Sequence, residues 1–372
     1  FDHLVQSGHI HPQTVVARLG GGTFAAWFGA TDRQQVEALR QQLDRAMQEP
    51  VSCSGHRVDL ALVLGLGLAD QGEADTERPV ATLLRNAEVA LHAAKRSAQT
   101  HAWYSEAQEA ARLDQLGLVS DLRKAVADHQ LQLWLQPKFS LATGLPIGAE
   151  ALVRWQHPVR GFVSPAEFVP FAEQTGHITL VTQWMLQQAI QTLAGWSATH
   201  PGLSIAVNVS TRDLQDPGFA SRVQQMVEAS GIQPNRLRLE ITESGLMEDA
   251  RQSMALLHAL SDIGLPLSID DFGTGYSSLA YLQQMPVSEL KIDRSFIDRL
   301  DTSPGTQRLV HAMVEMGHGL GLVVTAEGVE TDAEKATITA LGVDVMQGYL
   351  GSRPLHGQAL QTWLDGCATA RA

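Results

Sequence analysis

Polar side chains end several short apolar runs in the second half of the chain. Glu150 ends I-G-A-E, Asn208 ends I-A-V-N and Glu240 ends R-L-R-L-E. Five further polar residues stand in similar runs: Asp270 and Asp271 in L-S-I-D-D, Lys291 in E-L-K-I-D, Glu327 in V-V-T-A-E and Gln347 in V-M-Q-G-Y. A single carboxylate after a strand often only caps the following helix. Repeated over all of these runs, the pattern instead indicates a common site.

The residue types at these strand ends suit divalent cations with oxygen ligands. Carboxylates and one amide, without His or Cys, favour Mg²⁺ or Mn²⁺ over Zn²⁺. Adjacent Asp270 and Asp271 repel each other unless cations neutralise them, and two ions about 3.5–4 Å apart would do so. Such a pair stabilises the attacking and leaving oxygens of a phosphoryl displacement, with Asp270 as a shared ligand. Lys291 would orient the attacking water or stabilise developing charge.

These residues need a scaffold that brings strand ends together. After residue 122 short apolar segments alternate with helical ones, which predicts parallel strands with crossover helices. The expected strands are Gln132 to Phe139, Gly148 to Arg154, Ser204 to Val209, Arg236 to Ile241, Leu265 to Asp270, Glu289 to Ile292, Val323 to Glu327 and Val343 to Gly348. Eight such units over about 250 residues fit a (β/α)₈ TIM-type barrel, with its active site at the strand ends. A doubly wound open sheet is the structural alternative.

Residues 1–104 predict a smaller α/β domain. Two apolar runs flank a glycine-rich turn at Gly20 to Thr23, which is typical of a β-hairpin. We expect a helix over Asp32 to Gln48, a strand over Arg57 to Leu66 and a helix over Pro79 to Ser97. A polar connecting helix is expected over residues 105–121, followed by the barrel over residues 122–372.

The composition limits the partners and the compartment. With 27 basic against 40 acidic residues, the net charge of −13 argues against duplex nucleic acid as a partner. The two cysteines, Cys53 and Cys367, have no metal-ligand spacing and are consistent with a cytoplasmic chain. No apolar stretch approaches the ~20 residues of a spanning helix. Residues 1–4 are typical of the last turn of a helix, so we expect a sensor or membrane segment upstream of residue 1.

Ordered motifs through the second domain resemble one known family. The resemblance begins with E-A-L-V-R-W at Glu150 to Trp155 and P-A-E-F-V-P-F-A-E at Pro165 to Glu173. It continues with N-V-S at Asn208, E-I-T-E-S at Glu240 to Ser244, D-D-F-G-T-G-Y-S-S-L at Asp270 to Leu279, K-I-D at Lys291 to Asp293, A-E-G-V-E at Ala326 to Glu330 and Q-G-Y at Gln347 to Tyr349. These motifs resemble the EAL family of cyclic di-GMP phosphodiesterases, which act in bacterial second-messenger signalling. The resemblance covers essentially the whole second domain.

The resemblance implies a role for each matching residue and a likeness to homodimeric enzymes. One cation is implied to bind Glu150, Asn208, Glu240 and Asp270, and a second to bind Asp270, Asp271 and Glu327. Lys291, Glu327 and Glu243 are implied as catalytic residues, with Glu243 bracing the loop Asp271 to Leu279. The residues implied at the cyclic di-GMP ligand are Gln136, Leu152, Arg154, Pro170, Gln347 and Glu330. Leu135 departs from the family, which usually has an aromatic residue there.

The first domain resembles the carboxyl-terminal half of a GGDEF diguanylate cyclase domain. The matching segments are R-L-G-G-G-T-F at Arg18 to Phe24 and A-L-H-A-A-K at Ala90 to Lys95. Gly22 and Thr23 stand where that family places acidic residues, and His11 to Thr14 replaces its Arg-x-x-Asp pattern. We therefore expect a partial, inactive cyclase-like domain that serves regulation or dimerisation.

Three functions are compatible with this reading. We expect a hydrolase that cleaves cyclic di-GMP to linear pGpG with two Mg²⁺ or Mn²⁺ ions. The alternative is a receptor that binds cyclic di-GMP without turnover and signals to a partner, although such receptors usually lose several metal ligands. A carbohydrate-active barrel using Glu150 and Glu240 is the third, and it leaves Asp270, Asp271, Asn208 and Lys291 unexplained.

Overall fold

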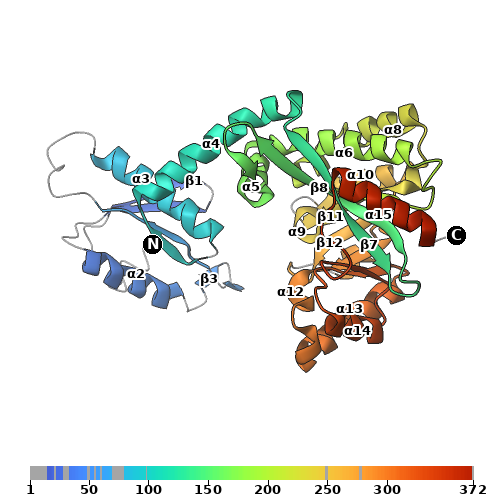
Figure 1. The fold of residues 1–372 in the computed structure, drawn as a ribbon. Coiled ribbons are helices and arrows are strands. Elements are labelled where there is room, and N and C mark those ends of the chain that lie inside the picture. The colour runs from blue at the N-terminus through green and yellow to red at the C-terminus, as the bar shows by residue number, and fades with distance from the viewer. Residues whose placement is uncertain are drawn as a thin grey trace. The chain divides into compact units, whose positions relative to one another are not determined.

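The computed structural model describes residues 15–20, 22–27, 33–47, 51–53, 56–58, 61–68, 79–97, 99–247, 250–275 and 279–370 (Figure 1). The chain forms two compact units, Phe1–Gly117 and Leu118–Ala372, which are treated separately below. Residues 1–14, which include the expected helical turn at residues 1–4 and the segment His11 to Thr14, lie outside the described residues.

The first unit contains short strands and two long helices. Strands β1 (Val15–Gly20) and β2 (Thr23–Trp27) form an antiparallel hairpin, and α2 (Arg33–Met47) follows. Helix α3 (Pro79–Arg96) packs against β5 (Leu64–Leu66) and β6 (His101–Trp103), which pair in parallel.

One expected strand of the first unit is wrong as a single element. Residues Arg57 to Leu66 supply two separate strands, β4 (His56–Val58) and β5. Strand β4 pairs antiparallel with β3 (Val51–Cys53), whereas β5 pairs with β6. A continuous apolar run does not show where a chain changes its pairing partner, because both partners accept the same side chains.

Helix α4 (Glu106–Ala127) leads from the first unit into the second. Its last three turns bury Leu118, Leu122 and Ala125 in the core of the second unit. This apolar contact extends the helix six residues past the expected end at residue 121, because those turns have a surface to pack against.

The second unit is a closed barrel. Its strands are β7 (Leu131–Ser140), β8 (Pro146–His157), β10 (Ser204–Val209), β11 (Leu237–Thr242), β12 (Leu267–Phe272), β13 (Glu289–Ile292), β14 (Val323–Ala326) and β15 (Val345–Gln347). They are hydrogen-bonded in the order β10 to β15, then β7 and β8, and pairing of β8 with β10 closes the ring. Closure rules out the open-sheet alternative. Strand β9 (Gly161–Val163) extends β8 as a hairpin outside the ring.

Strand β7 departs from the expected all-parallel barrel. It pairs antiparallel with both β8 and β15, while the other neighbouring pairs in the ring are parallel. The cause is the short connection at residues 141–145, since a parallel crossover needs about a dozen residues or more. The expected eight parallel units are therefore wrong in this one strand, and the α/β barrel architecture holds.

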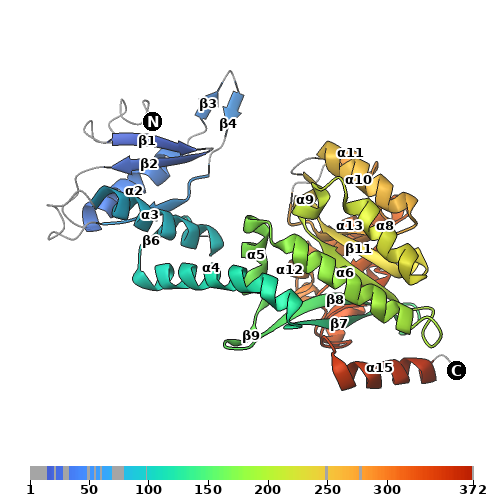
Figure 2. The same ribbon diagram turned by 90° about the horizontal axis from the view of Figure 1, so that it is seen from above.

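Helices surround the barrel (Figure 2). The helical segments of this unit are α5 (Pro165–Thr175), α6 (Ile178–Gly195), α7 (Thr211–Leu214), α8 (Phe219–Ser230), η1 (Pro234–Arg236), α9 (Glu243–Met247), α10 (Ala250–Asp262), α11 (Leu279–Leu282), α12 (Arg294–Ile297), η2 (Leu300–Thr302), α13 (Pro304–Gly319), α14 (Asp332–Ala340) and α15 (Gly357–Ala370). Alternate strand residues such as Val207, Leu239 and Leu290 are buried in the apolar core that the helices share. The intervening residues point to the barrel interior.

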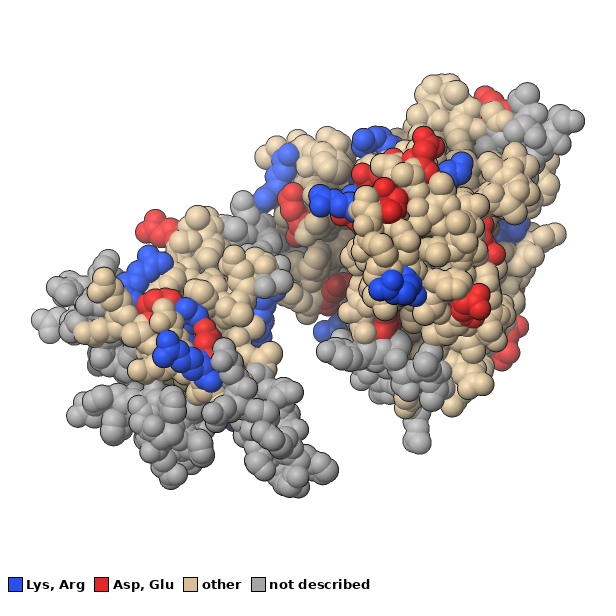
Figure 3. All heavy atoms as spheres, turned by 90° about the horizontal axis from the view of Figure 1, so that it is seen from below, with Lys and Arg blue, Asp and Glu red and all other residues tan. Residues whose placement is uncertain are grey.

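No described helix is long and apolar enough to span a membrane. On the face of the molecule drawn in Figure 3, acidic and basic side chains of the described residues are interspersed.

Candidate active site

The polar residues expected at strand ends occupy the interior positions of neighbouring strands. In the register of the barrel Ala206 lies opposite Glu150, Asn208 opposite Glu240, and Thr242 opposite Asp270. Asn208, Glu240, Thr242 and Asp270 lie in the carboxyl-terminal halves of β10, β11 and β12, where TIM-type barrels build their sites. Glu150 does not end its strand, because β8 continues for seven residues beyond it. Strand twist and closure thus bring residues that are up to 177 positions apart, Glu150 and Glu327, into one cluster around Lys291.

Two groups of carboxylates have the spacing of cation sites. The first is Glu150, Glu240 and Asp270, and the second is Asp270, Asp271 and Glu327. In each group one oxygen from every residue lies within 4.8 Å of the others. Asp270 belongs to both groups. Ligands of this kind match the oxygen preference of Mg²⁺ and Mn²⁺.

Lys291 is the central cation of the cluster. Its Nζ lies 2.6 Å from Glu327 Oε1, 2.8 Å from Glu240 Oε2 and 3.0 Å from Asp270 Oδ1. The side chain is fully buried. Burial by itself lowers the pKa of an ammonium group, but the surrounding carboxylates outweigh it and raise the pKa of Lys291 well above its usual value. Lys291 is therefore a fixed positive charge.

The acidic residues around Lys291 differ in their affinity for protons. Burial raises the pKa of Glu327 to about 8, and burial together with neighbouring carboxylates raises the pKa of Asp270 to about 6. Burial would raise the pKa of Glu150 too, but the charges of Lys291 and Lys138 and hydrogen bonds from Gln347 and Asn208 lower it. More negative charge is gathered here than Lys291 can neutralise, which is the condition under which cations bind.

Glu150 is held by two amides. Its Oε1 accepts a hydrogen bond from Asn208 Nδ2 at 2.7 Å, and its Oε2 accepts one from Gln347 Nε2 at 2.6 Å. Gln347 also donates to Gln136 Oε1 at 3.2 Å, while its own buried Oε1 has no hydrogen-bond partner among the described residues. A buried acceptor without a donor is costly and fits a site that receives a ligand.

The loop after β12 is fixed by Glu243. Glu243 Oε2 accepts hydrogen bonds from the backbone N–H of Gly273 at 2.9 Å and of Gly275 at 3.3 Å. Asp271, the last residue but one of β12 before this loop, has a left-handed backbone with φ of 54°. Glu243 is thus placed as the brace of the loop, and residues 276–278 of that loop lie outside the described part.

The expected ligand-binding residues fall into two groups. Gln136, Leu152 and Arg154 lie on adjoining positions of β7 and β8, where Trp134 pairs with Leu152 and Gln136 with Glu150. The Arg154 guanidinium is half-buried and 6.0 Å from the centroid of the Trp134 ring. Together with Gln347 they adjoin the carboxylate cluster.

Pro170 and Glu330 were also expected at the ligand. Among the described residues, no hydrogen bond or ion pair connects either of them to the carboxylate cluster. Pro170 is an exposed residue inside α5. Glu330 Oε1 pairs with Arg294 Nη2 at 2.7 Å at an exposed position.

Sequence reasoning missed Lys138 and Trp134. Lys138 Nζ donates to Glu240 Oε1, and the Trp134 ring stacks on His356 with centroids 5.6 Å apart. Both follow from the alternation of β7, because residues 134, 136 and 138 share one face. Gln136 was expected at the ligand, but the residues two positions on either side of it were not.

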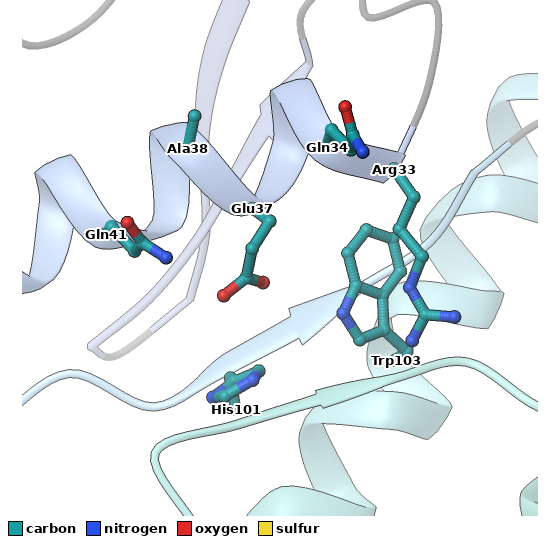
Figure 4. Close-up of a pocket in the computed structure, with 7 residues that line it drawn as sticks. All are labelled: Arg33, Gln34, Glu37, Ala38, Gln41, His101 and Trp103. Carbon is teal, nitrogen blue, oxygen red and sulfur yellow. The ribbon is translucent and has the colours of Figure 1, made fainter.

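The first unit has a separate hollow of about 580 Å³ (Figure 4). It lies between α2 and β6 and is lined by Arg33, Gln34, Glu37, Ala38, Gln41, His101 and Trp103. The Arg33 guanidinium lies 4.4 Å from the centroid of the Trp103 ring. This hollow contains no residue of the carboxylate cluster.

Comparison with protein families shows which family the second unit is related to. The model of the EAL domain matches residues 119–354, which is more than half of the chain. The chain belongs to the EAL domain family. The match includes all five clustered carboxylates and Lys291 and ends before α15. It does not extend over the first unit, for which no cyclase family is shown.

Two curated relatives from Pseudomonas aeruginosa illustrate the EAL relationship. The chain is 37% identical over 354 residues to the bifunctional diguanylate cyclase/cyclic di-GMP phosphodiesterase MucR, covering 95% of this chain and 51% of MucR. It is 38% identical over 353 residues to the cyclic di-GMP phosphodiesterase NbdA, covering 94% of this chain and 44% of NbdA. The chain thus spans about half the length of these relatives.

Solved structures agree with the EAL assignment. The MucR phosphodiesterase in complex with cyclic di-GMP is 42% identical and superimposes with a TM-score of 0.63, covering 66% of this chain and 99% of that one. The EAL domain of FimX from Pseudomonas aeruginosa, bound to cyclic di-GMP, is 25% identical with a TM-score of 0.59, covering 63% and 95%.

Proposed function

We propose that the second unit hydrolyses one phosphodiester bond of cyclic di-GMP to give linear pGpG. The proposal depends chiefly on the two carboxylate groups that share Asp270 beside Lys291. It is supported by the names of the similar proteins MucR and NbdA. The proposed dependence on metal ions follows from the same cluster.

We further propose that two cations, Mg²⁺ or Mn²⁺, bind at this cluster. Glu150, Asn208, Glu240 and Asp270 would hold one, and Asp270, Asp271 and Glu327 the other. Bound there, such ions would polarise the phosphoryl group and lower the pKa of a water molecule. The chain's own residues supply what holds them: Glu150 is fixed by Asn208 and Gln347, and Glu240 and Asp270 by Lys291.

Lys291 keeps its proton in this proposal. Its raised pKa and three close carboxylates make the Nζ a poor base, so it would stabilise negative charge on the phosphate rather than accept a proton. Arg154 would orient a phosphate oxygen from the rim. Glu243 would act through the loop that follows Asp271 and Phe272.

The first unit is proposed to be a degenerate, partial GGDEF-like domain with a regulatory role. In the β1–β2 hairpin Gly20 pairs with Thr23, and the described turn residues Gly22 and Thr23 carry no carboxylate. A cation therefore has no acidic ligand from these two positions. Dimerisation and an upstream sensor segment are further proposals that follow from the family resemblance.

The function is tested by incubating the whole chain with cyclic di-GMP and Mg²⁺ or Mn²⁺ and separating the nucleotides. We expect pGpG to accumulate and Glu150→Gln to lower the rate by about 10²-fold or more, because a cation ligand loses its charge. Glu228→Gln, which alters an exposed carboxylate on α8, is the control and should retain the wild-type rate. Binding of cyclic di-GMP without pGpG in either metal would favour the receptor alternative.

A further inference from the structure

A second polar layer lies beneath the carboxylate cluster in the barrel. Strand side chains alternate, so the residue two positions before each strand-end residue also points inward. These residues are Arg238 before Glu240, Ser268 before Asp270, Glu289 before Lys291 and Thr325 before Glu327. Barrel interiors are usually filled by branched apolar side chains. Because polar side chains are unusual at this depth, we expect this buried layer to have a specific role.

Glu289 is the centre of this lower layer. Its Oε2 accepts hydrogen bonds from Arg238 Nη1 at 2.8 Å and from Ser268 Oγ, and its Oε1 accepts one from Thr325 Oγ1 at 2.5 Å. Lys138 Nζ lies 3.9 Å from Oε2. Burial would raise the pKa of Glu289, but the charges of Lys138 and Arg238 lower it well below the usual range. Glu289 is a buried, fully satisfied anion.

Lys138 connects the two layers. It comes from β7, the antiparallel strand, so its side chain enters the barrel beside Glu289 and reaches up to Glu240. Glu240 is fully buried; its Oε1 accepts from Lys138 Nζ, and its Oε2 lies 2.8 Å from Lys291 Nζ. Each oxygen of Glu240 is thus held by a different ammonium group.

We propose that Lys138, anchored by Glu289, is a positioning residue that holds the Glu240 carboxylate in the orientation needed to bind a cation. This inference rests on the proposed function, because it assumes that Glu240 is a cation ligand. Lys138 itself lies below the cluster and touches no reacting atom. Its effect reaches the reaction only through Glu240.

Loss of Lys138 would have two opposite effects on the affinity for a cation. The direction of the measured change therefore distinguishes an effect of charge from an effect of positioning. Removing a positive charge near the cluster would by itself strengthen cation binding, as Coulomb attraction requires. Releasing Glu240 Oε1 from its donor would let the carboxylate turn and would weaken binding. Loss of a hydrogen-bond partner behind a metal ligand typically costs about 10–100-fold in metal affinity or activity. Positioning therefore predicts weaker binding.

The test measures Mn²⁺ binding directly, by the electron paramagnetic resonance of free Mn²⁺, in the whole chain and its variants. For Lys138→Met we expect the Kd for Mn²⁺ to rise about 10–100-fold. The KM for cyclic di-GMP at saturating Mn²⁺ should stay near the wild-type value. Lys124→Met, which removes an exposed lysine from α4, is the matched control and should bind Mn²⁺ as the wild type does.

A double variant protects the test against misfolding. Lys138→Met alone leaves Glu289 partly uncompensated, whereas Lys138→Met with Glu289→Gln removes the buried pair together, which proteins often tolerate. The double variant should also bind Mn²⁺ more weakly. Folded variants that bind Mn²⁺ with unchanged or higher affinity would overturn the proposal. A wild-type chain that neither binds Mn²⁺ nor cleaves cyclic di-GMP would instead overturn the proposed function.

Discussion

At the scale of single residues, the cluster around Lys291 stores unbalanced negative charge. Lys291 lies within 3.6 Å of an oxygen of each of Glu150, Glu240, Asp270 and Glu327. One ammonium group cannot neutralise four carboxylates, and Lys138 adds only one further charge. Burial raises the pKa values of Asp270 and Glu327, and neighbouring carboxylates raise them further, so protonation relieves both the burial of charge and the imbalance. Bound cations would relieve it in the same way.

This imbalance predicts that the chain loses stability with rising pH when cations are removed. The pKa of Glu327 is about 8 in the folded protein and near 4.5 as an unperturbed group. The folded state therefore binds the proton more tightly, so the free energy of unfolding falls between these two pH values and stays low above them. Each kcal/mol lost lowers Tm by about 2–4 °C in a domain of this size. Thermal unfolding in chelator from pH 5 to pH 9 measures the effect.

Glu327→Gln is the decisive variant, because glutamine cannot ionise. It should melt close to the wild type at pH 5 and above the wild type at pH 9, in chelator at constant ionic strength. Mn²⁺ should raise the wild-type Tm more at pH 9 than at pH 5. Parallel pH profiles for the two proteins would contradict this assignment of the titrating group.

The residues of the upper layer could be predicted from sequence, whereas their partners could not. Glu150, Glu240 and Asp270 end apolar runs, and the alternation of strand side chains predicts that such residues share a face, although β8, β11 and β12 each continue beyond them. Lys138 stands within a strand that reads like its neighbours, and its contact with Glu240 depends on the direction of β7. Pairing of Glu289 with Arg238 likewise depends on the register of strands 51 positions apart. Such contacts are tertiary, and no local pattern encodes them.

At the scale of elements, strand existence was predictable and strand direction was not. The limits of β10 and β13 agree with the expected segments, because both runs end at clear polar residues. Strand β7 was expected to be parallel, although the connection of five residues before β8 already excludes a crossover helix. The length of the connection between β7 and β8 would therefore have predicted the antiparallel direction of β7. The division of Arg57 to Leu66 had no such indication.

The loop between β12 and α11 gives a prediction at this scale. A Cβ added at Gly275 would lie 2.9 Å from Glu243 Cδ, so Gly275→Ala must displace the side chain that holds the loop. Asp271 would then lose its fixed position. We expect turnover to fall on the order of 10–100-fold, because small misplacements of site residues cost that much. Steady-state kinetics with cyclic di-GMP would measure it.

Gly305→Ala is the matched control for this loop. Gly305 lies in α13, and an added Cβ there would have no atom within 4 Å other than those of its chain neighbours and of the backbone of its own helix. Its rate and Tm should stay at wild-type values. Equal turnover by the two alanine variants would show that turnover does not depend on the contact between Glu243 and the loop.

At the scale of the whole molecule, the two units differ in whether they have the acidic residues that a catalytic metal site needs. Residues Leu118–Ala372 have a closed barrel, a continuous apolar core and a complete carboxylate cluster. The first unit has short strands and a hairpin turn whose described residues Gly22 and Thr23 lack acidic groups. Catalysis is therefore expected to depend on the barrel alone.

This difference predicts that a fragment of residues 106–372 hydrolyses cyclic di-GMP with the same metal requirement as the whole chain. The fragment keeps all of α4, because Leu118, Leu122 and Ala125 on that helix are buried in the barrel core. Nucleotide separation after incubation with cyclic di-GMP measures the rate. A folded fragment without turnover would mean that the first unit contributes to the active site.

Synthesis from GTP is the complementary measurement. We expect the whole chain to make no cyclic di-GMP from GTP and Mg²⁺, because the hairpin turn offers no carboxylate at Gly22 or Thr23 to hold a cation. The assay is best made with Glu150→Gln, since any cyclic dinucleotide formed would then escape hydrolysis and accumulate. Wild-type protein in a parallel reaction with cyclic di-GMP shows that the preparation is active. Accumulation of cyclic di-GMP by the variant would contradict the inactive assignment of the first unit and make the chain bifunctional.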